Sequence, residues 1–253
     1  MTRPAPARPR EMAIIPALNE AQRVGAVIAD LRRAVPGLDV LVVNDGSSDD
    51  TEAVARRAGA RVVSHPYRLG YGAALQTGYL YALRGGYERA LQIDGDGQHD
   101  ASRASALLDV VREDRADVAL ASRFLAGRPL AMPLARRIGS ATLRRLGRLL
   151  AGIRCTDPTS GFRAFDRRAL VLLASDDFPH DYPDMDVLIR LRFAGIRIAE
   201  IPATVRERSG GTSMHSGLRP LYYAYKVALA SVMAAIRGRR AARRPAARAR
   251  VPA

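Results

Sequence analysis

The residues best suited to chemistry stand in the segment LQIDGDGQHD, residues 91–100. The apolar run that ends at Asp94 is typical of a buried strand, which would deliver Asp94, Asp96 and Gln98 at its carboxyl end. Alternate residues of an extended chain share one face, so these side chains can converge. Two close carboxylates need a cation between them, and hard oxygen ligands suit Mg²⁺ or Mn²⁺. The alternative is an acidic turn, because Asp-Gly is an ordinary turn dipeptide.

Two further polar clusters follow predicted strands in the same way. The strand at 12–15 leads to Asn19 and Glu20, and the strand at 40–43 leads to Asp45. Strands and helices alternate over the first hundred residues, which predicts a mostly parallel sheet with helices on both faces and a ligand beyond the carboxyl ends of the strands. Asp45 would accept hydrogen bonds from a base or ribose, whereas turn and cap chemistry is the alternative for its segment.

The second half of the chain offers basic and acidic candidates. Arg123 follows a predicted strand at 117–121, and Arg208 adjoins a Gly-rich loop at 209–213, so each could clamp a phosphate. Asp184 and Asp186 lie at the start of a predicted helix and offer a possible general base. The helix dipole would stabilise the anion there and make a poorer base, so helix capping is the alternative.

The elements that position these residues follow from the spacing of apolar residues and from cap signals. Further strands are predicted at 61–64, 89–93 and 196–201, and a short strand after Phe162. Helices are predicted at 24–34, 51–58, 72–83, 102–113, 133–151, 167–174 and 184–193. We expect a disordered basic leader at 1–10, one catalytic domain at 11–216, an amphipathic helix at 217–236 and a disordered Arg-rich tail at 237–253.

The charge of the chain points to an anionic partner surface. The 253 residues carry a formal net charge of +15, arginines crowd the last stretch, and no acidic residue follows Glu207. The apolar segment 218–236 is interrupted by Arg219, Pro220 and Lys226, which favours a helix that lies in a membrane interface over one that spans it. A core-packing helix before a disordered tail is the alternative. Without an apparent signal peptide, we expect a cytoplasmic protein.

Several short motifs together carry a resemblance to a known family. The segments IPALNE, VVNDGSSDDT, RLGYGAALQTGY, QIDGDGQHD, ASRF, DPTSGFRAF and RSGGTS occur in the order found in family 2 glycosyltransferases. Over about residues 12–225 the chain looks most like the polyprenol-phosphate sugar synthases, the dolichol-phosphate mannosyltransferase-like branch. The resemblance implies a single α/β domain of glycosyltransferase-A type, a UDP- or GDP-linked sugar donor and a divalent metal, Mg²⁺ or Mn²⁺.

The resemblance also implies roles for individual residues. Donor contacts fall on Pro16, Ala17, Asn19, Glu20, Asp45, Asp94, Arg208 and Ser213. Metal ligands fall on Asp94, Asp96 and Gln98, and catalytic roles fall on Asp96, Arg123, Asp184 and Asp186, with Arg123 meeting the acceptor or its phosphate. In the nearest relatives a lysine commonly follows the equivalent of Ser213, whereas this chain has Met214 and lacks that phosphate contact.

The resulting hypothesis is a metal-dependent inverting transferase that moves a hexose from a nucleotide sugar to polyprenyl phosphate at the inner face of the plasma membrane, held by the anionic membrane surface. A lipid phosphate is already largely anionic at pH 7 and needs positioning more than deprotonation. A hydroxyl acceptor in polysaccharide or glycolipid synthesis, the main alternative, would need a base. A nucleotidyltransferase is conceivable, because it too needs metal-bound carboxylates. A nucleic-acid-binding protein would leave three acidic strand ends unexplained, so no nucleic acid partner is expected.

Overall fold

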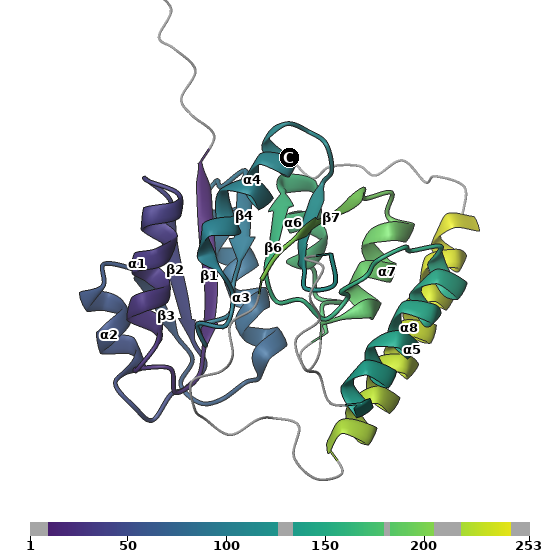
Figure 1. Cartoon of the computed structure of the whole chain (residues 1–253), viewed down its shortest axis with the longest axis horizontal. Helices are drawn as coiled ribbons and strands as arrows, with labels where there is room; N and C mark the ends of the chain where they lie inside the picture. The colour runs from purple at the N-terminus through teal and green to yellow at the C-terminus, as the bar shows by residue number, and fades with distance from the viewer. Residues whose placement is uncertain (1–9, 126–133, 180–182, 205–218, 244–253) are drawn as a thin grey trace, which may run out of the picture.

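A computed structural model of the chain describes residues 10–125, 134–179, 183–204 and 219–243 (Figure 1). These residues contain a seven-stranded sheet. Its strands are β1 (Glu11–Ala17), β2 (Asp39–Asn44), β3 (Arg61–Ser64), β4 (Arg89–Gln92), β5 (Val118–Ser122), β6 (Arg163–Asp166) and β7 (Ile198–Pro202). The order across the sheet is β3-β2-β1-β4-β6-β5-β7. The mostly parallel α/β sheet expected from the sequence is therefore confirmed, with one reversed strand.

The reversed strand is β6, which pairs antiparallel with both β4 and β5. The other pairings, including β1 with β4 and β5 with β7, are parallel. Since β6 runs against its neighbours, the loop that enters β6 lies at the same edge of the sheet as the carboxyl ends of β4 and β5. This edge therefore receives loops from both directions of the chain.

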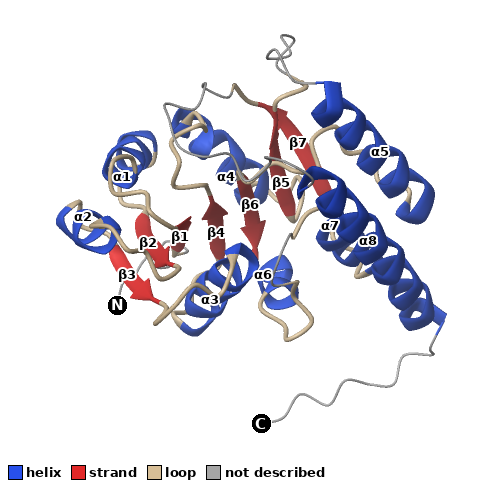
Figure 2. Ribbon diagram, turned by 90° about the horizontal axis from the view of Figure 1, so that it is seen from below, coloured by secondary structure: helices blue, strands red, loops and turns tan. Residues whose placement is uncertain are grey.

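The helices cover both faces of the sheet (Figure 2). In the described residues they are α1 (Val24–Ala34), α2 (Thr51–Arg57), α3 (Tyr71–Arg84), α4 (Ala104–Arg112), α5 (Leu134–Ala151), α6 (Arg167–Leu173), α7 (Met185–Phe193) and α8 (Arg219–Arg243), with a 3-10 turn at Ala101–Arg103. Helices α1, α2 and α4 pack on one face, and α3 and α6 on the other. Helices α5, α7 and α8 contact one another beyond the β7 end of the sheet.

Burial on both faces explains the continuous apolar run of β1. Neighbouring residues of a strand point to opposite faces, so Ile14 joins the core under α3 with Leu75, whereas Ile15 joins the core under α1 with Ile28. Both isoleucines are fully buried. A strand with a solvent-exposed face would have alternated apolar and polar residues instead.

Two predicted domain boundaries differ from the structure. Helix α8 ends at Arg243 rather than at residue 236, so residues 237–243, which we expected in the disordered tail, are helical. Arg10, which we placed in the disordered leader, donates a hydrogen bond to the Gly85 carbonyl (2.8 Å), and its guanidinium lies 4.3 Å from the centre of the Tyr87 ring. The rest of the predicted leader, residues 1–9, and the tail residues 244–253 lie outside the described residues.

Helix α3 approaches β1 more closely than a side chain would allow. A Cβ atom added at Gly78 would lie 2.3 Å from Cγ2 of Ile14. The glycine therefore sets how deeply α3 sits on the sheet, and so how far the side chains on the same helix reach towards the strands. Its buried neighbours on α3 include Leu75, Tyr79 and Ala82.

We expect Gly78→Ala to destabilise the protein, because the added methyl group must push α3 away from Ile14. Overpacking of this kind costs about 1 to 3 kcal/mol, which exceeds the gain of up to about 1 kcal/mol from the higher helix propensity of alanine. Urea unfolding would measure the difference. Gly139→Ala on α5 is the matched control: nothing lies within 4 Å of its added Cβ, so that variant should gain stability. Equal gains in both variants would contradict the packing argument.

Candidate active site

The predicted polar clusters meet at the edge of the sheet where the parallel strands end. Asp94 follows β4, Asp45 follows β2, and Arg123 follows β5. Burial lowers the pKa of Arg123, but the hydrogen bond and charge of Asp157 and the charges of Asp94 and Asp184 raise it on balance. The Asp157 carboxylate lies 2.6 Å from the guanidinium, and the negative charges of Asp94 and Asp184 also act on it. Strand ends far apart in the sequence thus form one charged site.

The Asp94 carboxylate is held on three sides. The Tyr71 hydroxyl donates a hydrogen bond to Oδ1 (2.7 Å), and Nε2 of His99 lies 3.4 Å from Oδ2. At Gly161 an added Cβ would lie 2.1 Å from Oδ2, so only glycine fits against this carboxylate. Burial raises the pKa of Asp94, but His99, Tyr71 and Arg163 together lower it by more, so its pKa falls below the usual value and the group is an anion at neutral pH.

The predicted metal ligands offer oxygen atoms without a closed cage. Oδ1 of Asp96 accepts a hydrogen bond from the backbone amide of Gln98 (3.0 Å), which forms a tight turn after Asp94. Within the described ranges, no group of three or more His, Cys, Asp or Glu side chains is arranged to hold a metal. Mg²⁺ sites commonly use one or two carboxylates and complete their coordination with water and substrate phosphates. The carboxylate and amide oxygens of Asp94, Asp96 and Gln98 fit that chemistry, and their role as metal ligands stays a prediction.

Asp45 organises a loop. Its carboxylate accepts hydrogen bonds from the backbone amides of Leu69 (2.8 Å) and Gly70 (2.9 Å), and Nδ1 of His65 lies 2.8 Å from Oδ1. These contacts fix the segment between β3 and α3 beside the end of β2. The nucleoside contact predicted for Asp45 stays a prediction, and the described partners of the side chain lie within the protein.

The predicted donor residues after β1 are tied to the loop after β2. Asn19 adopts a left-handed φ of 56°, and its Oδ1 accepts a hydrogen bond from the Ser48 amide (2.9 Å). The Glu20 amide donates to the Thr51 hydroxyl (2.8 Å), and the Glu20 carboxylate pairs with Arg23 (2.6 Å). Pro16 and Ala17 are buried at the end of β1, next to Val43 and Asn44 of β2. Their donor roles remain predictions.

Arg123 is clamped by a residue that the sequence reasoning did not single out. Asp157, which is fully buried, accepts three hydrogen bonds from Arg123: from Nε (2.7 Å), from Nη2 (2.6 Å) and from the backbone amide of Arg123 (3.0 Å). Behind this pair, Glu200 of β7 accepts hydrogen bonds from the backbone amides of Thr156 and Asp157. The motif DPTSGFRAF was the available signal, because its aspartate precedes a turn and a short strand.

Arg163 of β6 is a second buried cation that was missed. It is 4% exposed and donates to the carbonyl groups of Ser160 (2.7 Å), Pro158 (3.0 Å) and Pro183 (3.4 Å). The side chain therefore joins the loop before β6 to the segment before α7. An arginine between the apolar residues Phe162 and Ala164 was the signal for it, because a buried guanidinium needs several acceptors.

The acidic pair at the start of α7 divides into two environments. Asp186 is 1% exposed, and its Oδ1 accepts a hydrogen bond from the Asp184 amide (3.2 Å). Burial and the charge of Asp184 raise the pKa of Asp186 to about 6. Asp184 is only half-buried, and its charge acts on Arg123. Of the two carboxyl groups, Asp186 is therefore the one that can gain or lose a proton close to neutral pH.

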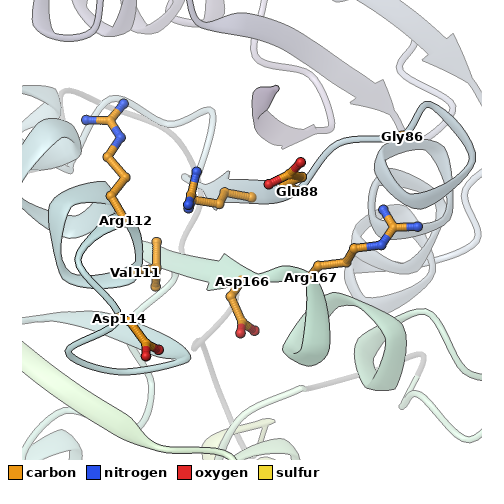
Figure 3. Close-up of a pocket in the computed structure, with 8 residues that line it drawn as sticks. Gly86, Glu88, Val111, Arg112, Asp114, Asp166 and Arg167 are labelled. Carbon is orange, nitrogen blue, oxygen red and sulfur yellow. The ribbon is translucent and has the colours of Figure 1, made fainter. Parts of the chain in front are cut away.

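Two predicted donor residues, Arg208 and Ser213, lie outside the described residues. A separate hollow of about 550 Å³ opens at the opposite edge of the sheet, where β4 begins and β6 ends (Figure 3). Arg89 and Arg112 line it, and both pair with Glu11. The hollow contains none of the predicted site residues, so it is not part of the charged site around Asp94.

Sequence comparison finds similarity to one family. The sequence model of glycosyl transferase family 2 matches residues 12–172. Polyprenol monophosphomannose synthase of Mycolicibacterium smegmatis is 33% identical over 236 residues, which cover 89% of this chain and 89% of that protein. Undecaprenyl-phosphate mannosyltransferase of Micrococcus luteus is 34% identical over 218 residues, which cover 82% and 88%. Dolichyl-phosphate hexose transferase of Haloferax volcanii is 32% identical over 203 residues, which cover 78% and 82%.

The fold is similar to that of glucosyl-3-phosphoglycerate synthase from Mycobacterium tuberculosis. Its crystal structure with Mn²⁺, uridine diphosphate and glucosyl-3-phosphoglycerate matches with a TM-score of 0.70 and 23% identity, and the match covers 90% of this chain and 80% of that chain. The glycosyltransferase-A type fold expected from the sequence is confirmed by this likeness.

The raised pKa of Asp186 predicts a pH-dependent stability. An aspartate in an unfolded chain titrates near pH 3.9. Folded Asp186, with its pKa of about 6, binds more protons than the unfolded chain between these values, so the free energy of unfolding falls as pH rises from about 4 to 6. A shift of this size corresponds to roughly 2 to 3 kcal/mol.

In Asp186→Asn the free energy of unfolding should not show this decrease, so the variant should gain stability relative to the unmodified protein as pH rises from 4 to 7. Urea unfolding at a series of pH values would measure the gain. Asp176→Asn, at an exposed position in the connection between α6 and α7, is the control and should show no such trend. Parallel pH profiles for Asp186→Asn and the unmodified protein would refute the raised pKa.

Proposed function

Because the chain belongs to glycosyl transferase family 2, we propose that this glycosyltransferase moves a hexose from a UDP- or GDP-linked sugar to a polyprenyl phosphate. The observation that carries the proposal is the convergence of Asp94, the Arg123–Asp157 pair and Asp184 at one sheet edge. The carboxylates there would hold a metal on the donor diphosphate, and the guanidinium would pair with the acceptor phosphate, so the edge offers a group for each phosphate-bearing substrate. The names of the relatives from three organisms support the lipid phosphate as acceptor.

On the donor side, the chain supplies oxygen ligands and ordered loops. Asp94, Asp96 and Gln98 would hold Mg²⁺ or Mn²⁺, which when bound would neutralise the charge that develops on the departing diphosphate. The loops that contain Asn19 and Asp45 would border the nucleoside, because both are fixed at the ends of β1 and β2 by hydrogen bonds. Mn²⁺ in the structural neighbour supports a divalent ion of this kind.

On the acceptor side, the chain positions a phosphate. An oxygen of the acceptor phosphate attacks the anomeric carbon from the face opposite the diphosphate. The new carbon–oxygen bond forms as the bond to the diphosphate breaks, and the nucleoside diphosphate departs with the electron pair. The acceptor oxygen is already anionic, so no base is needed. Arg123 would orient the phosphate, because Asp157 holds its guanidinium plane by two hydrogen bonds.

One observation favours a hydroxyl acceptor as the second candidate. Asp186 has a pKa of about 6, close to the value that suits a general base at neutral pH. Its full burial weighs against direct contact with an acceptor. We therefore rank transfer to a hydroxyl group second, and Asp186 would be the base in that reaction.

The surface of α8 supports a location at the cytoplasmic face of the plasma membrane. No helix in the described part of the chain is long and apolar enough to cross a membrane. Helix α8 buries Val227, Ala234 and Ala235 in the core, yet it exposes a second apolar stripe. That stripe consists of Tyr225, Leu229, Val232, Met233 and Ile236, which are 37% to 63% exposed and share one helical face.

Exposed arginines follow the apolar stripe of α8 directly, at Arg237, Arg239 and Arg240. An apolar face next to basic residues is the pattern of a helix that lies in the interface of an anionic membrane. Each arginine near such a surface contributes about 1 kcal/mol of attraction. One face of α8 therefore packs in the core, as the alternative interpretation expected, and we propose that the exposed apolar face lies in the membrane interface.

Incubation with a panel of UDP- and GDP-linked hexoses, Mg²⁺ or Mn²⁺ and polyprenyl phosphate should transfer radiolabel from one donor into the lipid phase. Asp96→Asn should abolish this transfer with an unchanged circular dichroism spectrum, because it removes a charged oxygen ligand from the proposed metal site. No lipid product with any donor, together with transfer to a soluble hydroxyl acceptor, would sink the lipid-phosphate proposal. Near-normal turnover of Asp96→Asn would refute the metal assignment.

The membrane proposal predicts that the double variant Leu229→Gln, Met233→Gln binds vesicles of phosphatidylcholine and phosphatidylglycerol about ten- to a hundredfold more weakly than the unmodified protein. Withdrawing two half-exposed apolar side chains from the interface costs about 1.5 to 3 kcal/mol. Sedimentation with vesicles would measure the affinity, and Val171→Gln, at an exposed position on α6, is the control. Equal vesicle binding by the double variant and the control would contradict the role of α8.

A further inference from the structure

An unbroken chain of side-chain hydrogen bonds connects helix α3 to Asp94. The Tyr79 hydroxyl donates to Oε1 of Gln92 (2.6 Å). Nε2 of Gln92 donates to the Tyr71 oxygen (3.2 Å), and the Tyr71 hydroxyl donates to Oδ1 of Asp94 (2.7 Å). The chain begins on α3, crosses to β4, returns to the first residue of α3 and ends on the carboxylate. None of the predicted site roles included Tyr71, Gln92 or Tyr79.

The hydrogen bonds of this series all donate in one direction, towards Asp94, because each group has a limited set of donors. A tyrosine hydroxyl has a single hydrogen, and an amide side chain donates only through its nitrogen. Tyr79 donates to the amide oxygen of Gln92, which turns the amide nitrogen towards Tyr71. Because Tyr71 accepts from Gln92, its own hydrogen is directed to Asp94. The groups behind Tyr71 therefore fix it as a donor to the carboxylate.

Packing alone does not require these polar atoms. Gln92 is 2% exposed and Tyr79 is 1% exposed, and burial of polar groups is costly unless they form hydrogen bonds. The ring of Tyr79 packs edge-on against Phe165 and Phe178, contacts that a phenylalanine would make equally well. The only described use of the buried hydroxyl is its bond to Gln92. The hydrogen-bond chain thus places a donor against Asp94, and it does so by burying polar groups, which costs free energy that an apolar core would not.

We propose that Tyr71 is a positioning residue, which orients the Asp94 carboxylate for the divalent metal and the donor diphosphate, with Gln92 and Tyr79 fixing its hydroxyl. This inference rests on the proposed function. Each carboxylate oxygen has two lone pairs, so Oδ1 can accept from Tyr71 and still bind a ligand. Without the Tyr71 hydroxyl, the carboxylate could rotate between Gly161 and His99. Removing a group that hydrogen-bonds to a metal-binding carboxylate typically lowers metal affinity or activity 10- to 100-fold.

The test compares Tyr71→Phe with Tyr81→Phe on the same helix. The Tyr81 hydroxyl faces Arg61 at 3.5 Å at the surface and takes no part in the chain. The EPR signal of free Mn²⁺ would measure metal affinity, with and without saturating UDP or GDP and without acceptor. We expect Tyr71→Phe to weaken Mn²⁺ binding about tenfold or more, with nucleotide binding in EDTA unchanged, and Tyr81→Phe to bind as the unmodified protein does.

Tyr79→Phe is the second variant, because it frees the Gln92 amide to turn and keeps the Tyr71 hydroxyl. It should weaken Mn²⁺ binding by less than Tyr71→Phe, and it keeps the inference testable if Tyr71→Phe fails to fold. If Tyr71→Phe and Tyr79→Phe both bind Mn²⁺ as tightly as Tyr81→Phe does, the positioning role is overturned and the proposed function stays intact. If Tyr71→Phe does not fold, the same result for Tyr79→Phe alone overturns the positioning role. No Mn²⁺ or nucleotide binding by the unmodified protein would instead overturn the proposed function and this inference with it.

Discussion

The ion pair between Arg123 and Asp157 is the interaction on which the site depends. Asp157 has no access to solvent, so without its partner it would be a buried, uncompensated charge, a situation that typically costs 3 to 5 kcal/mol. The pair fastens the end of β5 to the loop that enters β6. Glu200 of β7 holds the same loop from behind through backbone amides. Three strands are thereby joined at the edge where the charged groups gather.

The reversal of β6 makes this arrangement possible. In a fully parallel sheet, the loop before a strand would lie at the opposite edge, far from the carboxyl end of β4. Because β6 is antiparallel, Gly161 contacts the Asp94 carboxylate, and Arg163 reaches the carbonyl groups of the loops before β6 and α7. The short distance between Gly161 and Asp94 also explains why a residue without a side chain stands there.

Helix α8 shows how one element can serve two surfaces. Its buried face completes the core with α7, and its exposed apolar face is followed by arginines. The sequence of this helix carried both signals, since apolar residues occupy most of its circumference and charges interrupt them. Which apolar residues face the core and which face outwards was not predictable, because that depends on where α7 packs against it.

The sequence by itself determined the order of strands and helices, the placement of Asp94, Asp45 and Arg123 after strands, and the family. These features are local, since they follow from apolar periodicity, turn residues and short motifs. Only the tertiary structure decided the partners: Asp157 for Arg123, Tyr71 for Asp94, and loop amides for Asp45. These partners come from residues 23 to 34 positions away along the chain. The physical reason is that the order and direction of the strands determine which groups lie beside a charged side chain at the edge of the sheet, and those groups compensate its charge.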